Sequence, residues 1–338
     1  MTNDIYLFDM DAVLLHSGGY HAALTATVNH FAVEMGFDAP DLTEDEIQVF
    51  EAAGVTSEWD SAPICLAALL LDGRSRPDFA ALVRRVSAEM RPGECPAEAA
   101  YRIFANHTPP FPGGAIRRER GAGGVGLADL LLNSRDLRRS RVMSTFQQFT
   151  LGPAFESTYG LPRTIETEAF LSKYDRPLLT QPIPANSVIY TARPCKPPRD
   201  APPETGYAPE AELGAELVGV GHLPIVGFGS MQWLEAQIGG LAEHYVKPAP
   251  VHALAAIAVA AGAPESESLI AAASKARDET PALFKELRAG RVTVFEDSAR
   301  SIGGVREAVR MLGAGWECVG IGIADGGPKL AALEKAAD

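Results

Sequence analysis

The sequence predicts an α/β fold: a doubly wound parallel sheet with an inserted, mostly helical domain. Strand-like apolar runs alternate with helical patterns from residue 186 to the C-terminus, which is typical of a parallel sheet covered on both faces. A further strand-like run at residues 4–9 needs such a sheet to join, and residues 16 to about 185 have mostly helical spacing. We therefore expect one core made of residues 1–15 plus 186–338, and an inserted domain at 16–185.

The expected elements follow one another in a regular order. Strands are expected in NSVIYTARP (186–194), LPIVGFGS (223–230), RVTVFEDS (291–298) and ECVGIGIAD (317–325), with a further short strand in HYVKP (244–248). Helices are expected in WLEAQIGG (233–240), APVHALAAIAVAAG (249–262) and GGVREAVRMLG (303–313). In the insert, residues 20–36 have helical apolar spacing and end at Gly36, a suitable C-cap. The stretch 108–126 is rich in Pro, Gly and Arg, so we expect an exposed loop there.

Composition disfavours several classes of protein. The formal net charge is −13 and the isoelectric point is about 5.1, so we expect neither a nucleic-acid nor an anionic-membrane partner, which would need a basic surface. No run of about 18 apolar residues occurs and no basic region precedes an apolar stretch at the N-terminus, so we expect no membrane span and no secretory signal. The four cysteines are far apart and form no CxxC pattern, which favours reduced thiols in a cytoplasmic protein.

Polar side chains gather where the expected core strands end. In an open parallel sheet, ligands bind outside the carboxyl ends of the strands. The residues expected at that edge are Asp9, Asp11, Thr191, Lys247, Glu296 and Asp297. Carboxylates placed so close together repel one another unless a cation lies among them. Oxygen-only ligands suit Mg²⁺, so the sequence predicts a magnesium site there.

The same residues predict phosphoryl transfer. A carboxylate is able to act as a nucleophile and form an aspartyl-phosphate, and we assign this role to Asp9. A bound cation and Lys247 would offset the negative charge of the incoming phosphoryl group. A second carboxylate two residues further on, Asp11, would protonate the leaving alcohol and then activate a water molecule.

Four short motifs resemble those of the haloacid dehalogenase (HAD) superfamily, in the family's order. They are DMDAVLLHS (9–17), VIYTARP (188–194), VKPAP (246–250) and VFEDSARSIGG (294–304). The family places a cap domain between its first and second motifs, which matches the insert. The resemblance implies Mg²⁺ bound by Asp9, the backbone carbonyl of Asp11 and Asp297, with Glu296 as a ligand or a neighbour of the ligands. It also implies that Thr191 and Lys247 hold the phosphoryl group.

Three positions depart from the family pattern. Ala12 and Val13 replace the usual Gly and Thr, and His16 replaces the usual second Asp. Ala12 requires a backbone conformation that tolerates a Cβ, and Val13 lacks a hydroxyl group. Asp11 is present, which argues against the dehalogenase branch. Arg193, close to Thr191, and His16, at the start of the insert, are candidate substrate-binding residues; each is also compatible with an ordinary surface position.

The sequence therefore indicates a Mg²⁺-dependent phosphohydrolase, a phosphoric monoester hydrolase that acts on a small phosphorylated metabolite selected by the cap. A phosphomutase with the same core is an alternative, because both share the first half-reaction. A regulatory or binding homologue with weak catalysis is another, supported by Ala12, Val13 and His16. The GAGGVG stretch (121–126) matches a dinucleotide fingerprint in letters, but it follows RRER rather than a strand, so we reject that site.

Overall fold

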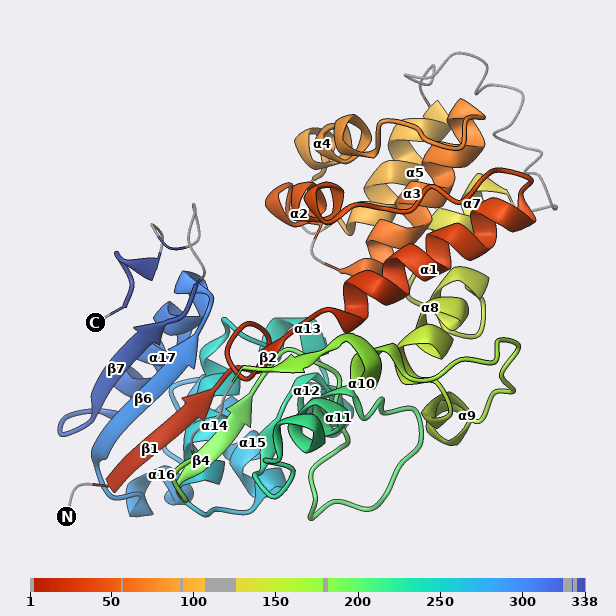
Figure 1. The fold of residues 1–338 in the computed structure, drawn as a ribbon. Helices are drawn as coiled ribbons and strands as arrows, with labels where there is room; N and C mark the ends of the chain where they lie inside the picture. The colour runs from red at the N-terminus through yellow and green to blue at the C-terminus, as the bar shows by residue number, and fades with distance from the viewer. Residues whose placement is uncertain are drawn as a thin grey trace. The chain divides into compact units, whose positions relative to one another are not determined.

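The chain forms two compact units in the computed structural model (Figure 1). The structure describes residues 3–55, 57–91, 94–106, 126–178, 182–324, 330 and 333–337. The core unit comprises Met1–Ser17, Phe155–Pro162 and Asp175–Asp338, and the helical unit comprises Gly18–Ala154 and Arg163–Tyr174. The expected loop at 108–126 lies outside the described residues, except for Gly126.

The core unit contains a five-stranded sheet in the order β5-β4-β1-β6-β7. Its strands are β1 (Asn3–Phe8), β4 (Ser187–Tyr190), β5 (Ile225–Val226), β6 (Gly290–Glu296) and β7 (Glu317–Gly322). Every neighbouring pair is parallel, so all the carboxyl ends meet at one edge. The predicted α/β fold class is confirmed. Figure 1 shows β1 between β4 and β6, at the centre of the sheet.

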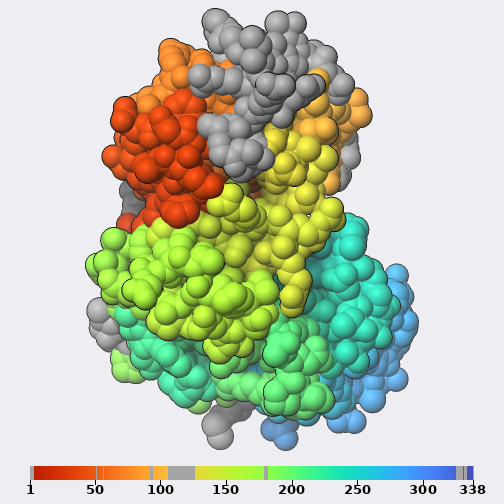
Figure 2. Space-filling view, turned by 90° about the vertical axis from the view of Figure 1, so that its right-hand side faces the viewer, coloured from red at the N-terminus to blue at the C-terminus, as the bar shows by residue number. Residues whose placement is uncertain are grey.

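Helices cover both faces of this sheet. They are α11 (Glu210–Val218), α12 (Phe228–Ile238), α13 (Ala242–Tyr245), α14 (Pro250–Ala260), α15 (Glu265–Lys275), α16 (Ala282–Glu286) and α17 (Ala299–Leu312). Successive strand side chains point to opposite faces. Ile5 and Leu7 pack with α14 and α17 on one face, whereas Phe8 packs with α11 on the other. Figure 2 shows one side of this unit, where residues from about 190 to 250, green to teal, form much of the surface.

A second, two-stranded sheet lies in the core unit, beside the first and the last of the four points where the chain crosses between units. It consists of β2 (Leu15–His16) and β3 (Arg176–Pro177), which run antiparallel with His16 opposite Arg176. The helix α9 (Ala154–Tyr159) also belongs mostly to the core unit.

The strand expected at 244–248 is wrong. The helix α13 ends at Tyr245, the N–H of Val246 donates to the carbonyl of Ala242, and the chain then runs as a loop through Lys247. A five-residue run is too short for its periodicity to separate a helical turn from a strand.

The helical unit consists of α1 (Gly19–Glu34), α2 (Glu44–Ala52), α3 (Glu58–Asp72), α4 (Phe79–Glu89), α5 (Pro96–Asn106), α7 (Leu127–Leu131), α8 (Arg141–Leu151) and α10 (Phe170–Tyr174). Helix α3 is buried along most of its length and forms the centre of this unit's own apolar core. Gly36 follows α1 with φ +81°, in the left-handed conformation that favours glycine after a helix. Among the described helices, none is both long and apolar enough to cross a lipid bilayer.

Helix α17 lies very close to the loop that carries Lys247. A Cβ at Gly304 would lie 2.1 Å from the carbonyl oxygen of Pro248, whereas a Cβ at Gly303 would meet no atom within 4 Å. Gly304 is buried and Gly303 is exposed in the same helix. The close approach of α17 to the loop therefore depends on the missing side chain of Gly304 and not on that of Gly303.

We expect Gly304→Ala to lower the free energy of unfolding by about 1–3 kcal/mol, because backbone must move to admit the new carbon. The matched change Gly303→Ala should raise it by about 0.5–1 kcal/mol, because alanine favours the helix and meets no neighbour. Urea unfolding of both variants measures the difference. Equal effects at the two positions would contradict the close packing of α17 on the loop.

Candidate active site

Two neighbouring strands place a pair of buried carboxylates side by side. Asp9 follows β1 directly, and Glu296 is the last residue of β6. The register pairs Phe8 with Phe295, and the N–H of Asp9 donates to the carbonyl of Phe295 at 3.0 Å. Asp9 is 4% exposed and Glu296 is 0% exposed. Two acids are thus held together at the edge where ligands bind in parallel sheets.

Lys247 connects these two acids. Its Nζ lies 2.6 Å from Oδ1 of Asp9 and 2.7 Å from Oε1 of Glu296. The same ammonium lies 3.5 Å from the carbonyl oxygen of Tyr190, at the end of β4. The lysine side chain is only 9% exposed, so these charges are largely shielded from water. The ammonium and the two carboxylates are held together strongly, because separation would leave a buried, uncompensated charge.

The cluster contains more carboxylates than positive groups to balance them. Burial raises the pKa of Asp9 well above its ordinary value, and the neighbouring charge of Glu296 raises it further. Burial likewise raises the pKa of Glu296. Burial opposes the charged form of Lys247, but the carboxylates of Asp9 and Glu296 outweigh it and raise the pKa of the lysine. One ammonium therefore does not fully stabilise the ionised carboxylates.

A third carboxylate completes a group that suits a divalent cation. Asp297 follows Glu296, and one oxygen from each of Asp9, Glu296 and Asp297 lies within 4.8 Å of the others. Oxygen donors with excess negative charge are what Mg²⁺ prefers. Glu296 is held in place by the N–H groups of Asp297 and Ser298, each 3.1 Å from Oε2. The residues present therefore fit the magnesium ion expected from the sequence.

Thr191 lies at the same edge, directly after β4. It is fully buried, and its N–H donates to the carbonyl of Val226 at 3.2 Å. Its Oγ1 accepts a hydrogen bond from the N–H of Arg193 at 3.2 Å. The loop after β4 is thereby folded back on Thr191.

Asp11 is engaged by Arg193 rather than by Lys247. Nε and Nη2 of Arg193 donate to the Asp11 carboxylate, the shortest contact being 2.6 Å, and Nη1 donates to Asp175 at 3.0 Å. Burial by itself would raise the pKa of Asp11, but the charge and hydrogen bonds of Arg193 hold it below its ordinary value. The guanidinium is 2% exposed. Sequence reasoning missed Asp175, because it lies within the expected insert at 16–185 and no motif singles it out.

The remaining candidate, His16, is exposed on β2 opposite Arg176. Ala12 is expected in a conformation that tolerates a Cβ, but its φ is +59°, the left-handed conformation that a Cβ makes costly. It lies in a tight turn in which the carbonyl of Met10 accepts the N–H groups of Leu14 and Leu15, each at 2.9 Å.

His252 is a second residue that sequence reasoning missed. It is fully buried in α14, and its Nδ1 accepts the N–H of Lys247 at 2.9 Å. Its Nε2 lies 2.9 Å from the carbonyl oxygen of Val226, to which Thr191 also donates. A ring nitrogen that accepts while the other donates belongs to the neutral imidazole. The only available signal was a lone histidine within an apolar helix.

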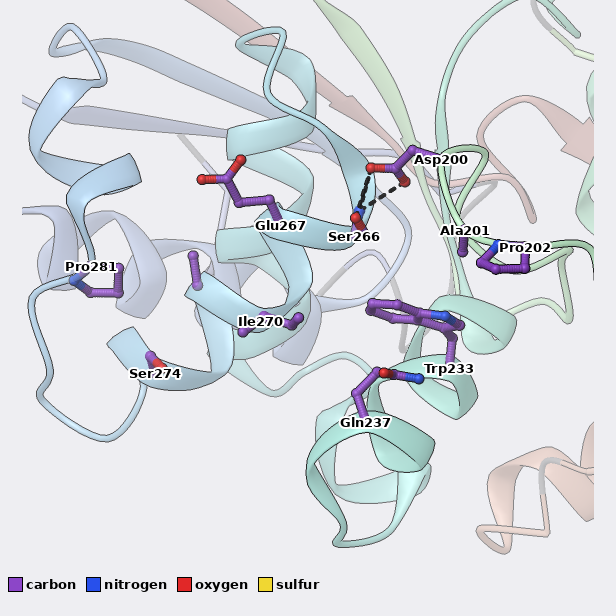
Figure 3. A pocket seen from close by; sticks show the side chains of 11 residues that line it. Asp200, Ala201, Pro202, Trp233, Gln237, Ser266, Glu267, Ile270, Ser274 and Pro281 are labelled. Atoms are coloured by element: carbon purple, nitrogen blue, oxygen red, sulfur yellow. Dashed lines mark hydrogen bonds between the residues drawn. The ribbon is translucent and has the colours of Figure 1, made fainter.

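A separate pocket of about 570 Å³ lies elsewhere in the core unit (Figure 3). Trp233 of α12 and Ile270 of α15 line it, and Asp200 accepts hydrogen bonds from the N–H and hydroxyl of Ser266 at its rim. None of the predicted site residues lines this pocket, so it is not part of the candidate active site.

The buried histidine predicts an acid-sensitive stability. Burial lowers the pKa of His252 to about 3, whereas an unfolded histidine titrates near 6.5. Between these values the unfolded chain binds a proton that the folded chain does not, so stability falls as the pH falls from 6.5 towards 3. From pH 7 to pH 5 the contribution is about 2 kcal/mol.

Urea unfolding at pH 7 and pH 5 measures this effect. His252→Asn should be less stable at pH 7 but should lose about 2 kcal/mol less than the wild type on acidification. The exposed His244→Asn is the matched control and should keep the wild-type pH dependence. An unchanged pH dependence in His252→Asn would show that this histidine is not the titrating group.

Comparisons with known proteins give the fold and no more. No protein-family model matches the chain, and no curated protein matches it. An X-ray structure solved as a Northeast Structural Genomics Consortium target is similar with a TM-score of 0.57 and 14% identity, over 99% of this chain and 94% of that one. Phosphatase Tt82 from Thermococcus thioreducens gives a TM-score of 0.49 and 15% identity, over 97% of this chain and 98% of that one. At this identity, the first similarity shows a shared fold alone.

Proposed function

We propose that the protein is a Mg²⁺-dependent phosphohydrolase of the haloacid dehalogenase type, acting on a small phosphorylated metabolite through an aspartyl-phosphate. The observation that carries the proposal is the ammonium of Lys247, 2.6 Å from Asp9 and 2.7 Å from Glu296, with Asp297 beside them. A nucleophilic carboxylate, a buried lysine and two further acids at one strand edge are the parts that phosphoryl transfer from a monoester requires.

In the first half-reaction, a carboxylate oxygen of Asp9 attacks phosphorus, and the bond from phosphorus to the alcohol oxygen breaks. The negative charge of the bound substrate raises the pKa of Asp11, which takes up a proton and gives it to that oxygen as it leaves. In the second half-reaction, water attacks the phosphorus of the aspartyl-phosphate and gives a proton to Asp11. The bond between phosphorus and Asp9 breaks, so the products are an alcohol and inorganic phosphate, and both aspartates return to their initial states.

The other residues of the cluster bind and orient the phosphoryl group. Lys247 and the hydroxyl of Thr191 donate to its oxygens, which keeps phosphorus in line with Asp9. Asp9, Asp297 and the backbone carbonyl of Asp11 would hold Mg²⁺, with Glu296 beside them. When bound, the ion supplies the positive charge that the cluster lacks and lets the phosphate approach a carboxylate.

The helical unit is the proposed cap that selects the substrate. The chain leaves the core unit after Ser17, six residues beyond Asp11, and returns for good at Asp175 after a short stretch of core unit at Phe155–Pro162. This is the place in the chain order where the superfamily that the four motifs resemble carries its cap. Selection by an inserted domain leaves the chemistry in the core unchanged.

We expect the wild type to release phosphate from members of a panel of phosphorylated metabolites and from an aryl phosphate, with Mg²⁺ and not with EDTA. Asp9→Asn should lower turnover by at least about 1,000-fold while keeping the fold, because it removes the nucleophile and keeps the shape. The same change at the exposed Asp278 is the matched control and should leave turnover unchanged. Turnover that survives in Asp9→Asn would reject the covalent route.

Metal binding has a test that needs no turnover. Mg²⁺ at about 100 times its dissociation constant should stabilise the wild type by about 2.7 kcal/mol, seen as a rise in Tm over the EDTA sample. Asp297→Asn should reduce that rise, because it removes one charged oxygen donor. An equal rise in the wild type and in Asp297→Asn would place the ion elsewhere.

A further inference from the structure

Arg193 is fixed inside the core unit by its backbone. Its N–H donates to Oγ1 of Thr191, and its carbonyl accepts the N–H of Phe228 at 2.9 Å. The residue as a whole is 3% exposed. Helix α11 passes so near that a Cβ at Gly214 would lie 3.4 Å from Nη1. The guanidinium is therefore enclosed rather than free to reach into solvent.

Asp175 holds one side of this guanidinium. Its Oδ2 accepts from Nη1 at 3.0 Å, and its side chain is 0% exposed. Loss of one member of such a buried pair leaves the other as an uncompensated charge, so the pair resists separation. With Nη1 fixed by Asp175, the rigid planar group leaves Nε and Nη2 turned towards Asp11.

The contacts on Asp11 are unequal between its two oxygens. Oδ1 accepts from Nη2 at 2.6 Å, from Nε at 2.9 Å and from the hydroxyl of Ser17. Among the described residues, Oδ2 accepts only from Nε, at 3.0 Å. The Asp11 side chain is 34% exposed although the guanidinium that holds it is 2% exposed. Oδ1 is saturated, and Oδ2 keeps the capacity to meet another group.

We propose that Arg193 is a positioning residue that orients Asp11 so that Oδ2 faces the leaving oxygen of the substrate, and that Asp175 anchors Arg193 for this task. This role rests on the phosphohydrolase function proposed above. It differs from the direct contact with substrate that the sequence suggested for Arg193, because the donors of its guanidinium already serve protein carboxylates.

Leaving-group dependence separates this role from a purely structural one. An alkyl phosphate needs a proton on its leaving oxygen, whereas an aryl phosphate with an acidic phenol needs little help. In Asp175→Asn and Arg193→Lys we expect kcat for an alkyl phosphate to fall about 100-fold, which is what misplacement by about 1 Å costs. The KM should change by less than about threefold, and the aryl phosphate should lose less than about tenfold, because binding and nucleophile are intact.

Two further variants complete the experiment. The exposed Arg291→Lys, at the start of β6, is the matched control and should behave as the wild type. Ser17→Ala removes one hydrogen bond to Oδ1 without disturbing the buried charges, so it should fold even if the other variants do not. It should show the same preference for the aryl substrate with a smaller loss. Circular dichroism and Tm establish that each variant is folded.

The outcomes are distinguishable. Folded variants that lose both substrates equally, or that lose neither, would overturn the positioning role while the wild type remains a phosphohydrolase. If the wild type shows no turnover, or turnover that needs neither Mg²⁺ nor Asp9, the proposed function is rejected and the role of Arg193 with it. A selective loss of turnover on the alkyl substrate, smaller in Ser17→Ala than in Asp175→Asn and Arg193→Lys, would support the proposal.

Discussion

The ammonium of Lys247 is the group on which the arrangement of the candidate site depends. The register of β1 and β6 places Asp9 and Glu296 next to each other in the interior, where two carboxylates repel. A single cation between them makes that juxtaposition tolerable, and it is delivered by a loop rather than by a strand. The loop is itself held from two directions, by His252 of α14 and by the close approach of α17 at Gly304. The packing of α14 and α17 against this loop therefore also fixes the position of the positive charge in the site.

Much of the core could be predicted because its signals are local. A buried strand in a parallel sheet gives a continuous apolar run, and β1 and β4 contain such runs at residues 5–8 and 188–190. Acids that follow these runs fall at one edge by topology alone, so Asp9, Glu296 and Asp297 could be grouped before their contacts were known. The backbone at Ala12 differs from the expectation of a conformation that tolerates a Cβ, because its φ is left-handed, which a glycine would adopt freely and an alanine adopts at some cost.

What the sequence concealed depends on contacts between distant residues. Asp175, which contacts Arg193, directly precedes β3, and a two-residue strand paired with another leaves no readable pattern. His252 has the helical position of a core residue, and only the fold shows that both its nitrogens serve the site. The strand expected at 244–248 failed for the same reason, since a short run takes its conformation from its neighbours.

The pairing of β2 with β3 bears on how a chain with so large an insertion folds at all. Within the helical unit the first and last residues are already neighbours, since a Cβ at Gly18 would lie 2.8 Å from the carbonyl oxygen of Tyr174. A helical unit that folds first therefore brings Ser17 and Asp175 together before the core forms. Folding of the helical unit then offsets the entropy cost of closing that long loop. For the parallel sheet, the joining of β1 to β4 becomes an almost local step.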